Sequence, residues 1–188
     1  MDVIEVIHSW RSIRSFRAEA LTRAEVEDLL WHAVQVSTPP GNETPWSMCV
    51  LEGVEHIERL GEQAIDFARA NRPPGEAGWS WVDRPGFKVF WGAPVAVIIS
   101  AEAGKTSAVF DCHRAGQNLV LAAHSCGLGS CWLGAPLPWL QSADIAVSLG
   151  VKPGFEPAVV LALGHPVERP EPKSRSRPDI AWHSDFAT

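Results

Sequence analysis

A chain of 188 residues fits one domain with enough length to bury a sizeable core, and 46% hydrophobic with 20% charged residues is typical of a globular protein. The net charge of −6 disfavours non-specific nucleic-acid binding, and no stretch approaches the length of a membrane span. Asp2 and Glu5 interrupt any apolar run that a signal peptide would need, so we expect a cytoplasmic protein with reduced thiols.

The first predicted element is a short N-terminal helix, whose apolar face carries Val3, Ile4, Ile7 and Trp10. Arg11 and Arg14 come next, on either side of Ser12. At this spacing on a helical turn, both guanidinium groups could reach one anion. The alternative is a solvated basic turn, which the dipole at a helix C-terminus favours.

A second helix is predicted after the capping box that joins Thr22 and Glu25, with Val26, Leu29, Leu30, Ala33 and Val34 facing inward. Residues 37–46 contain three prolines and a glycine, which predict a stiff loop whose polar groups are free to meet a ligand. A short strand over 48–51 and a third helix over 54–70 come next.

Residues 71–87 are predicted to be irregular, and a loop of this length with Trp79 and Trp81 is typical of a lid or of a disordered segment. Two interface tryptophans are the alternative. Residues 94–100 are β-branched and almost continuously apolar, so we expect a strand buried on both faces, followed by a turn over 101–110.

The longest predicted helix begins at Asp111, as its N-cap, and ends at Gly127 in the left-handed conformation. Its inward face carries Ala115, Leu119, Ala122 and Cys126, widened by Val120 and Ala123. Glycines at 127, 129 and 134 predict a turn with uncovered backbone amides, which suits a flat or anionic ligand. An ordinary helix cap is the alternative.

A helix over 140–149 and a second buried strand over 157–164 complete the predicted elements. The tail, 168–188, is rich in proline and charge and includes Lys173 and Arg175; such a cluster is most often solvated. No repeat or composition break is visible, so residues 1–188 are taken as one domain.

Several kinds of site are excluded or disfavoured. No Walker A motif, GxGxxG fingerprint or nucleophile elbow is present. The group that could be considered for a metal matches no zinc spacing, and we assign no metal ligands: Cys112, His113, His124, Cys126 and Cys131. There remains a set of basic residues near both ends of the chain, which in one fold could hold a phosphate, a sugar-like chain and a planar ring.

Four stretches, in this order along the chain, resemble the nitroreductase-like flavoproteins: 11–16, Gly41-Asn42 with Pro45-Trp46, 117–134 with the strand after it, and Lys173-x-Arg175. The resemblance implies an α+β fold, a three-layer sandwich with a mixed, mostly antiparallel sheet flanked by helices. It also implies an intertwined homodimer with two FMN sites at the interface.

Under this resemblance, Arg11, Ser12 and Arg14 would hold the FMN phosphate and the pyrimidine edge of the ring. The partner chain would contribute Thr38, Pro39, Pro40 and Asn42. Leu133 and Gly134 would offer backbone N–H groups near the flavin N5 atom, and Lys173 and Arg175 would complete the phosphate site. The implied reaction is ping-pong: NAD(P)H gives a hydride to the flavin, and a nitroaromatic, quinone or similar acceptor is then reduced. No side-chain acid, base or nucleophile is assigned.

Three positions depart from the family pattern. Trp10 stands where relatives often have an arginine, and Pro39 and Thr44 replace a serine and a glutamine. Three alternatives stay open: another flavin reaction of the superfamily (dehalogenation, dehydrogenation or flavin fragmentation), a module that stores or senses FMN, and a dimeric scaffold with an empty cleft.

Overall fold

The computed structural model describes residues 2–36, 44–73, 75 and 77–183. Four strands form one antiparallel sheet in the order β1-β2-β4-β3: β1 (Trp46–Glu52), β2 (Val95–Glu102), β3 (Gly129–Trp132) and β4 (Phe155–Gly164). All three strand pairs are antiparallel, and one isolated parallel bridge joins Ser12 to Ser130 on the outer side of β3. The helices are α1 (Val3–Ser9), α2 (Arg23–Ala33), α3 (Val54–Asn71), the 3₁₀ helix η1 (Ala77–Asp83), α4 (Thr106–Ser125), α5 (Leu137–Leu140) and α6 (Ala143–Ser148).

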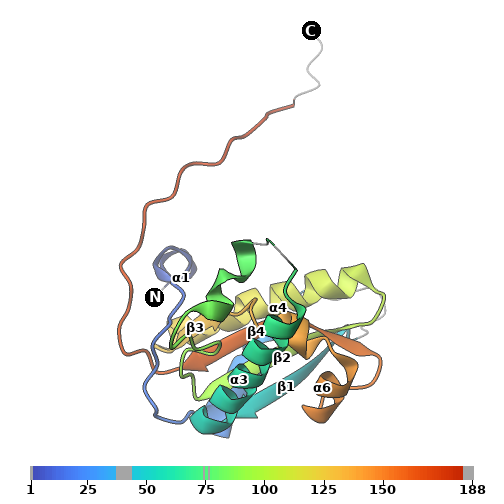
Figure 1. The fold of residues 1–188 in the computed structure, drawn as a ribbon. Helices are drawn as coiled ribbons and strands as arrows, with labels where there is room; N and C mark the ends of the chain where they lie inside the picture. The colour runs from blue at the N-terminus through green and yellow to red at the C-terminus, as the bar shows by residue number, and fades with distance from the viewer. Residues whose placement is uncertain (1, 37–43, 74, 76, 184–188) are drawn as a thin grey trace.

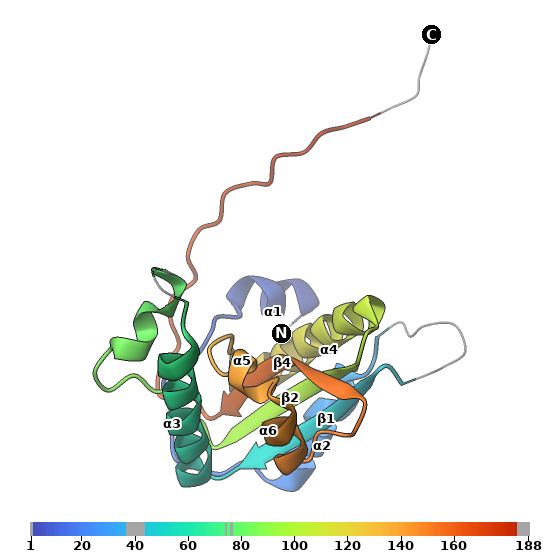
Figure 2. The ribbon, with the colours of Figure 1, turned by 45° about the vertical axis from the view of Figure 1, so that its right-hand side comes forward.

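Helices cover both faces of this sheet, so the predicted three-layer α+β sandwich is confirmed (Figures 1 and 2). Successive residues of β2 point to opposite faces. Val97 and Ile99 pack with α2 and α4, whereas Ala96 and Ile98 pack with α3 and α5. All the predicted strands are present, and the predicted helix over 54–70 is α3, with its expected inward residues buried.

The central helix α4 begins earlier than the sequence predicted. It starts at Thr106, and Asp111 lies inside it, 2% exposed and paired with Arg114 one turn later. The expected N-cap was therefore wrong, because this carboxylate is satisfied within the helix. Its buried residues continue to His124, whereas Cys126 lies beyond the helix end and is exposed.

The end of α4 was predicted correctly, but the glycine turn expected after it was not. Gly127 has φ 80°, and its N–H donates to the His124 carbonyl while the Leu128 N–H donates to that of Ala123, a Schellman cap. The expected turn is instead the edge strand β3, because Gly129 to Trp132 pair with β4. Hydrogen bonds to β4 therefore occupy backbone groups that the sequence predicted to be uncovered.

Two other segments differ from expectation. In α1 it is Val6 that is buried, whereas Val3, Ile4 and Ile7 are exposed. The helix expected over 140–149 is broken into α5 and α6. Within the described residues no helix has the length and apolar character needed to cross a membrane.

The C-terminal tail leaves β4, passes α1 and extends away from the rest of the chain (Figures 1 and 2). Residues 168–183 have no regular secondary structure and are exposed. The tail therefore reaches the site through side chains and not as part of the sheet.

Candidate functional site

The segment after α1 is fixed to the edge of the sheet. The Ile13 N–H donates to the Ser130 carbonyl at 2.9 Å, and the Trp10 indole N–H donates to the Ser130 hydroxyl at 2.9 Å. Ile13 is buried against β3, where Gly129 leaves room for its side chain. These contacts fix the backbone that carries Arg11, Ser12 and Arg14.

Arg11 combines two roles that the sequence left open. Its Nη1 donates to the carbonyls of His8 and Trp10, so it does cap the C-terminal end of α1. Its Nε, however, is buried and has no partner among the described residues. A buried donor without a partner costs free energy, about 1–3 kcal/mol, which a bound anion would recover.

A groove of about 780 Å³ opens beside Arg11, between α1 and the tail. Four of the predicted site residues line it together: Arg11, Ser12, Lys173 and Arg175. No carboxylate is among the described residues that line it, which are otherwise Ile7, His8, Trp10, Pro172 and Ser174. Three cationic side chains and two hydroxyls around one groove are the donor set that a phosphate requires. Trp10 also lines the groove, and its indole N–H is occupied by the Ser130 hydroxyl.

Arg14 lies apart from this groove. Because the Ser12–Ser130 bridge is parallel, Arg14 is carried toward the C-terminal end of β3. Burial raises the pKa of the Cys131 thiol there, and the charge of Arg14 and a hydrogen bond with the Ser12 side chain offset part of that rise. The Arg14 guanidinium lies over the ring of Trp91, 5.9 Å from its centroid.

The two residues that end β3 differ in what they can offer a ligand. The Leu133 N–H donates to the Val160 carbonyl at 2.9 Å, so the expectation that it faces a ring is corrected: β4 takes this donor. Within the described residues, the Gly134 N–H has no backbone partner, and a methyl group built on Gly134 would meet nothing within 4 Å. A flat ring could therefore approach the backbone at Gly134.

The loop contribution expected from Thr38, Pro39, Pro40 and Asn42 lies outside the described residues. The expected lid contains the helix η1. Trp79 and Trp81 stack at 6.3 Å, and Trp81 lies 5.3 Å from Phe87, so the tryptophans belong to an aromatic cluster beside α3.

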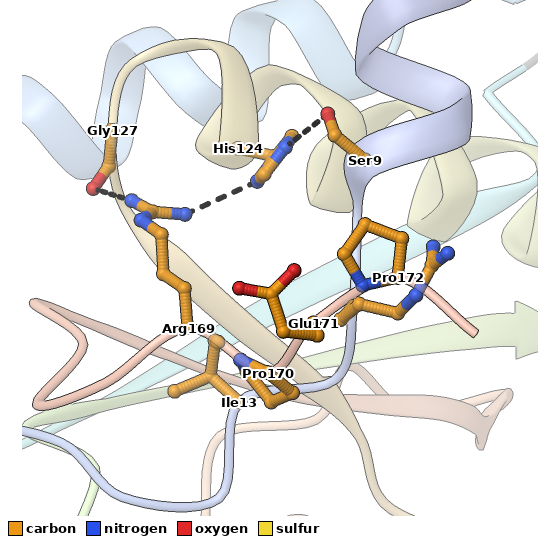
Figure 3. Close-up of a pocket in the computed structure, with 9 residues that line it drawn as sticks. Ser9, Ile13, His124, Gly127, Arg169, Pro170, Glu171 and Pro172 are labelled. Carbon is orange, nitrogen blue, oxygen red and sulfur yellow. Dashed lines mark hydrogen bonds between the residues drawn. The ribbon is translucent and has the colours of Figure 1, made fainter.

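A second pocket of about 470 Å³ lies between α4, α1 and the start of the tail (Figure 3). The sequence did not predict the contacts within it. Arg169 donates to the Gly127 carbonyl and, at 3.2 Å, to Nδ1 of His124. His124 Nε2 lies 2.8 Å from the Ser9 hydroxyl. Since arginine can only donate, Nδ1 accepts and Nε2 carries the proton, which describes a neutral histidine.

This pocket anchors the tail. Arg169 places a cation at the Gly127 carbonyl, just past the C-terminal end of α4, where the helix dipole favours a positive charge. A charge in a proline-rich tail gives no local signal for such a contact, so only the folded chain reveals it. Among the described residues, no group of three or more His, Cys, Asp or Glu side chains could hold a metal ion.

Comparisons with known proteins agree with this fold. A protein of Methanothermobacter thermautotrophicus named "Putative NADH dehydrogenase/NAD(P)H nitroreductase" is 28% identical over 95% of this chain and 85% of its own. A Bacteroides fragilis nitroreductase with bound FMN superposes with a TM-score of 0.82 at 23% identity, over 98% of this chain and all of that chain. An oxidized iodotyrosine deiodinase bound to FMN and 3-iodo-L-tyrosine superposes with a TM-score of 0.75 at 18% identity, over 97% of this chain and all of that one.

The sequence itself also matches a family model. The model is that of the Nitroreductase family, and it covers residues 7–165, from α1 through the end of β4. The match includes the segment fixed to β3, the central helix and the Gly134 turn, whereas Lys173 and Arg175 of the groove lie beyond it. This chain belongs to the Nitroreductase family.

Proposed function

We propose that this protein is an FMN-dependent oxidoreductase that takes a hydride from NAD(P)H and reduces a nitroaromatic, a quinone or a similar acceptor. The observation that carries the proposal is the groove in which Arg11, Ser12, Lys173 and Arg175 meet around a buried guanidinium Nε without a partner. An anion in that groove would satisfy the orphan donor and neutralise the three cations. The FMN-bound relatives of the same fold support a flavin phosphate as that anion.

The remaining residues fit the rest of the cofactor. With the phosphate in the groove, the flavin ring would extend along the end of β3 toward the open backbone at Gly134. Arg14, away from the groove, would place a positive charge beside the ring. Bound FMN supplies the hydride chemistry, and the chain sets its orientation and its electrostatic environment. We assign no side chain as acid, base or nucleophile.

We also propose that the working form is a homodimer in the cytoplasm. Three apolar side chains of α1, Val3, Ile4 and Ile7, are exposed in the single chain, and so is Phe110 on α4. Apolar surface of this kind is favourable to bury against a second copy. The partner would bring Thr38, Pro39, Pro40 and Asn42 to the flavin. All four cysteines are free thiols, in keeping with a reducing compartment.

The test is a visible absorption spectrum of the purified protein, supplied with FMN, before and after NADPH or NADH is added under nitrogen. We expect a protein-bound flavin band that bleaches. If the bound band bleaches with dithionite but with neither pyridine nucleotide, the protein binds flavin without the proposed activity. If FMN does not bind, the site assignment fails as well.

The acceptor is tested separately on the reduced protein. Reoxidation by a nitroaromatic or a quinone would support the reaction proposed here. Reoxidation by a halogenated phenol with release of halide, and by neither of the other acceptors, would instead favour a dehalogenating reaction, for which the deiodinase provides a precedent in the same fold.

A further inference from the structure

Trp91 has an unusual backbone conformation. Within the described residues it is the one non-glycine residue with a positive φ, at 60°. A residue with a β-carbon costs about 1 kcal/mol or more in this left-handed region. Such residues persist where the surrounding structure holds them, and they gather at functional sites. The conformation therefore calls for a reason.

Contacts on both sides of Trp91 hold it in place. Phe90 is fully buried in the core. The Gly92 N–H donates to Oε1 of Glu58 at 2.9 Å, and the Lys88 Nζ lies 3.3 Å from Oε2 of the same carboxylate. One glutamate on α3 therefore clamps the loop before and after Trp91. The Ala93 N–H donates to the Phe90 carbonyl at 3.1 Å, which closes a turn whose two central residues, Trp91 and Gly92, have φ of 60° and 74°; the Glu58 contacts hold this turn to α3.

In this position the Trp91 ring contacts Arg14. Phe87 lies against Trp91 edge to face, with centroids 5.2 Å apart at 75°. The Arg14 guanidinium lies over the ring at 5.9 Å. Among the described residues no carboxylate forms an ion pair with Arg14. Trp91 is the contact that the structure provides for this exposed cation.

An aromatic face is a particular kind of partner for an arginine. It attracts the face of the guanidinium, so the N–H groups in the plane of that group stay free to donate. A carboxylate would occupy those N–H groups and cancel the charge. An aromatic partner thus limits the rotamers of a long side chain and leaves its charge and donors available to a ligand.

We propose that Trp91 is a positioning residue, which holds the Arg14 guanidinium so that its free N–H groups face the edge of the bound flavin ring. This inference rests on the proposed function. Glu58 on α3 would then act on the cofactor site through the turn that carries Trp91. Without the ring, Arg14 would lose its rotamer entropy only when FMN binds, and the affinity would fall.

The experiment is a double-mutant cycle in which FMN affinity is measured by titration of the full-length apoprotein, followed through flavin fluorescence. Trp91→Asn removes the ring but tolerates the left-handed backbone, because asparagine adopts it readily. Trp91→Phe keeps an aromatic face. Arg14→Ala is combined with each, and thermal melting of every variant reports stability separately.

We expect Trp91→Asn to weaken FMN binding about tenfold and Trp91→Phe to weaken it about threefold or less, in line with the range of cation–π energies. In the Arg14→Ala background, Trp91→Asn should change the affinity by less than about twofold, because the residue that it positions is gone.

The outcomes separate this inference from the proposed function. If Trp91→Asn costs the same factor with and without Arg14, or if Trp91→Phe loses as much as Trp91→Asn, Trp91 does not act through Arg14 and the inference is overturned. If the wild type does not bind FMN, or Arg14→Ala leaves its affinity unchanged, the assignment of the flavin site has failed and the inference fails with it.

Discussion

Two regions meet at the candidate site, and they are held in different ways. The segment from Trp10 to Phe16 is built into the sheet: Ser12 bridges Ser130, and Phe16 bridges Pro166. The tail over 168–183 has no regular structure and is tied to the body by Arg169. The fixed region loses its conformational entropy during folding, whereas under the proposed function the tail would lose its entropy when it closed on a ligand. Cations from the two regions should therefore contribute different amounts to the free energy of ligand binding, even where they make the same contacts.

The largest effects are expected from removing one cation of each region. Arg14→Ala and Lys173→Ala should each weaken FMN binding by about 1.5–3 kcal/mol, the worth of hydrogen bonds to a charged group. Arg14→Ala should lie at the upper end, because ordering of the tail offsets part of what Lys173 contributes. Equilibrium titration with FMN measures both. Equal affinity for wild type and both variants would remove these residues from the site.

Gly129→Ala should damage the fixed region itself. The added methyl group would lie 2.9 Å from Cγ1 and 3.1 Å from Cβ of Ile13. Overpacking of this kind should lower the free energy of unfolding by about 1–3 kcal/mol and displace the segment that carries Arg11 and Ser12. Urea denaturation and FMN titration report the two effects.

Gly134→Ala is the matched control for this substitution. Its methyl group meets nothing within 4 Å. The free energy of unfolding should therefore stay within about 0.5 kcal/mol of wild type, while FMN binding weakens because the methyl group stands where the ring would lie. A variant with unchanged FMN affinity would show that the ring does not approach Gly134.

The tail anchor should make stability depend on pH. Burial, and then the charges of Arg169 and Arg11, hold the pKa of His124 below its ordinary value of 6.5. As pH falls below 6.5, His124 binds a proton in the unfolded chain but not yet in the folded chain, so the free energy of unfolding falls. The contribution of His124 is complete above pH 6.5 and is lost as pH falls toward the lower, folded-state pKa. Urea midpoints at several pH values measure this. His124→Gln should flatten the dependence of stability on pH in this window. An unchanged slope would show that His124 does not cause that dependence.

The smallest effect expected is a difference in thiol labelling between the two regions. Burial raises the pKa of Cys112 to about 11 and also raises the pKa of Cys131, which lies behind the fixed segment. Cys126, next to Gly127, whose carbonyl accepts from Arg169, is exposed. At a pH of about 8, an alkylating reagent and mass spectrometry should show Cys126 labelled well before the other two, because only the thiolate reacts. Labelling of Cys131 at the same rate would mean that the fixed segment opens readily.

Local signals in the sequence were enough for most of the fold. The capping box at Thr22 and Glu25 forms as predicted, and the apolar runs that became β2 and β4 were recognised from their β-branched residues. Long-range contacts decided the rest. Gly129 to Trp132 form a strand only because β4 presents an edge to them. Asp111 is paired within α4, so a residue type typical of an N-cap stands inside the helix.

The candidate site divides along the same line. The basic residues were identified from their types and order, and the groove brings Arg11, Ser12, Lys173 and Arg175 together. Arg11 and Ser12 are fixed because their segment pairs with β3, whereas Lys173 and Arg175 lie in the tail. No local sequence pattern predicts this pairing. Trp91 was missed because its left-handed backbone belongs to the turn closed between Phe90 and Ala93, and tryptophan is not a residue type that indicates such a position.

The central claim is that cations of the fixed region and of the tail share one phosphate site. Its most direct test is the ratio of the affinities for FMN and for riboflavin, which has the same ring without the phosphate, in wild type and in the double variant Lys173→Ala/Arg175→Ala. We expect wild type to prefer FMN by at least about a hundredfold, and the variant to lose about tenfold or more of that preference with riboflavin affinity unchanged. If the variant keeps the full preference for FMN, the tail takes no part in the phosphate site, and the claim is wrong.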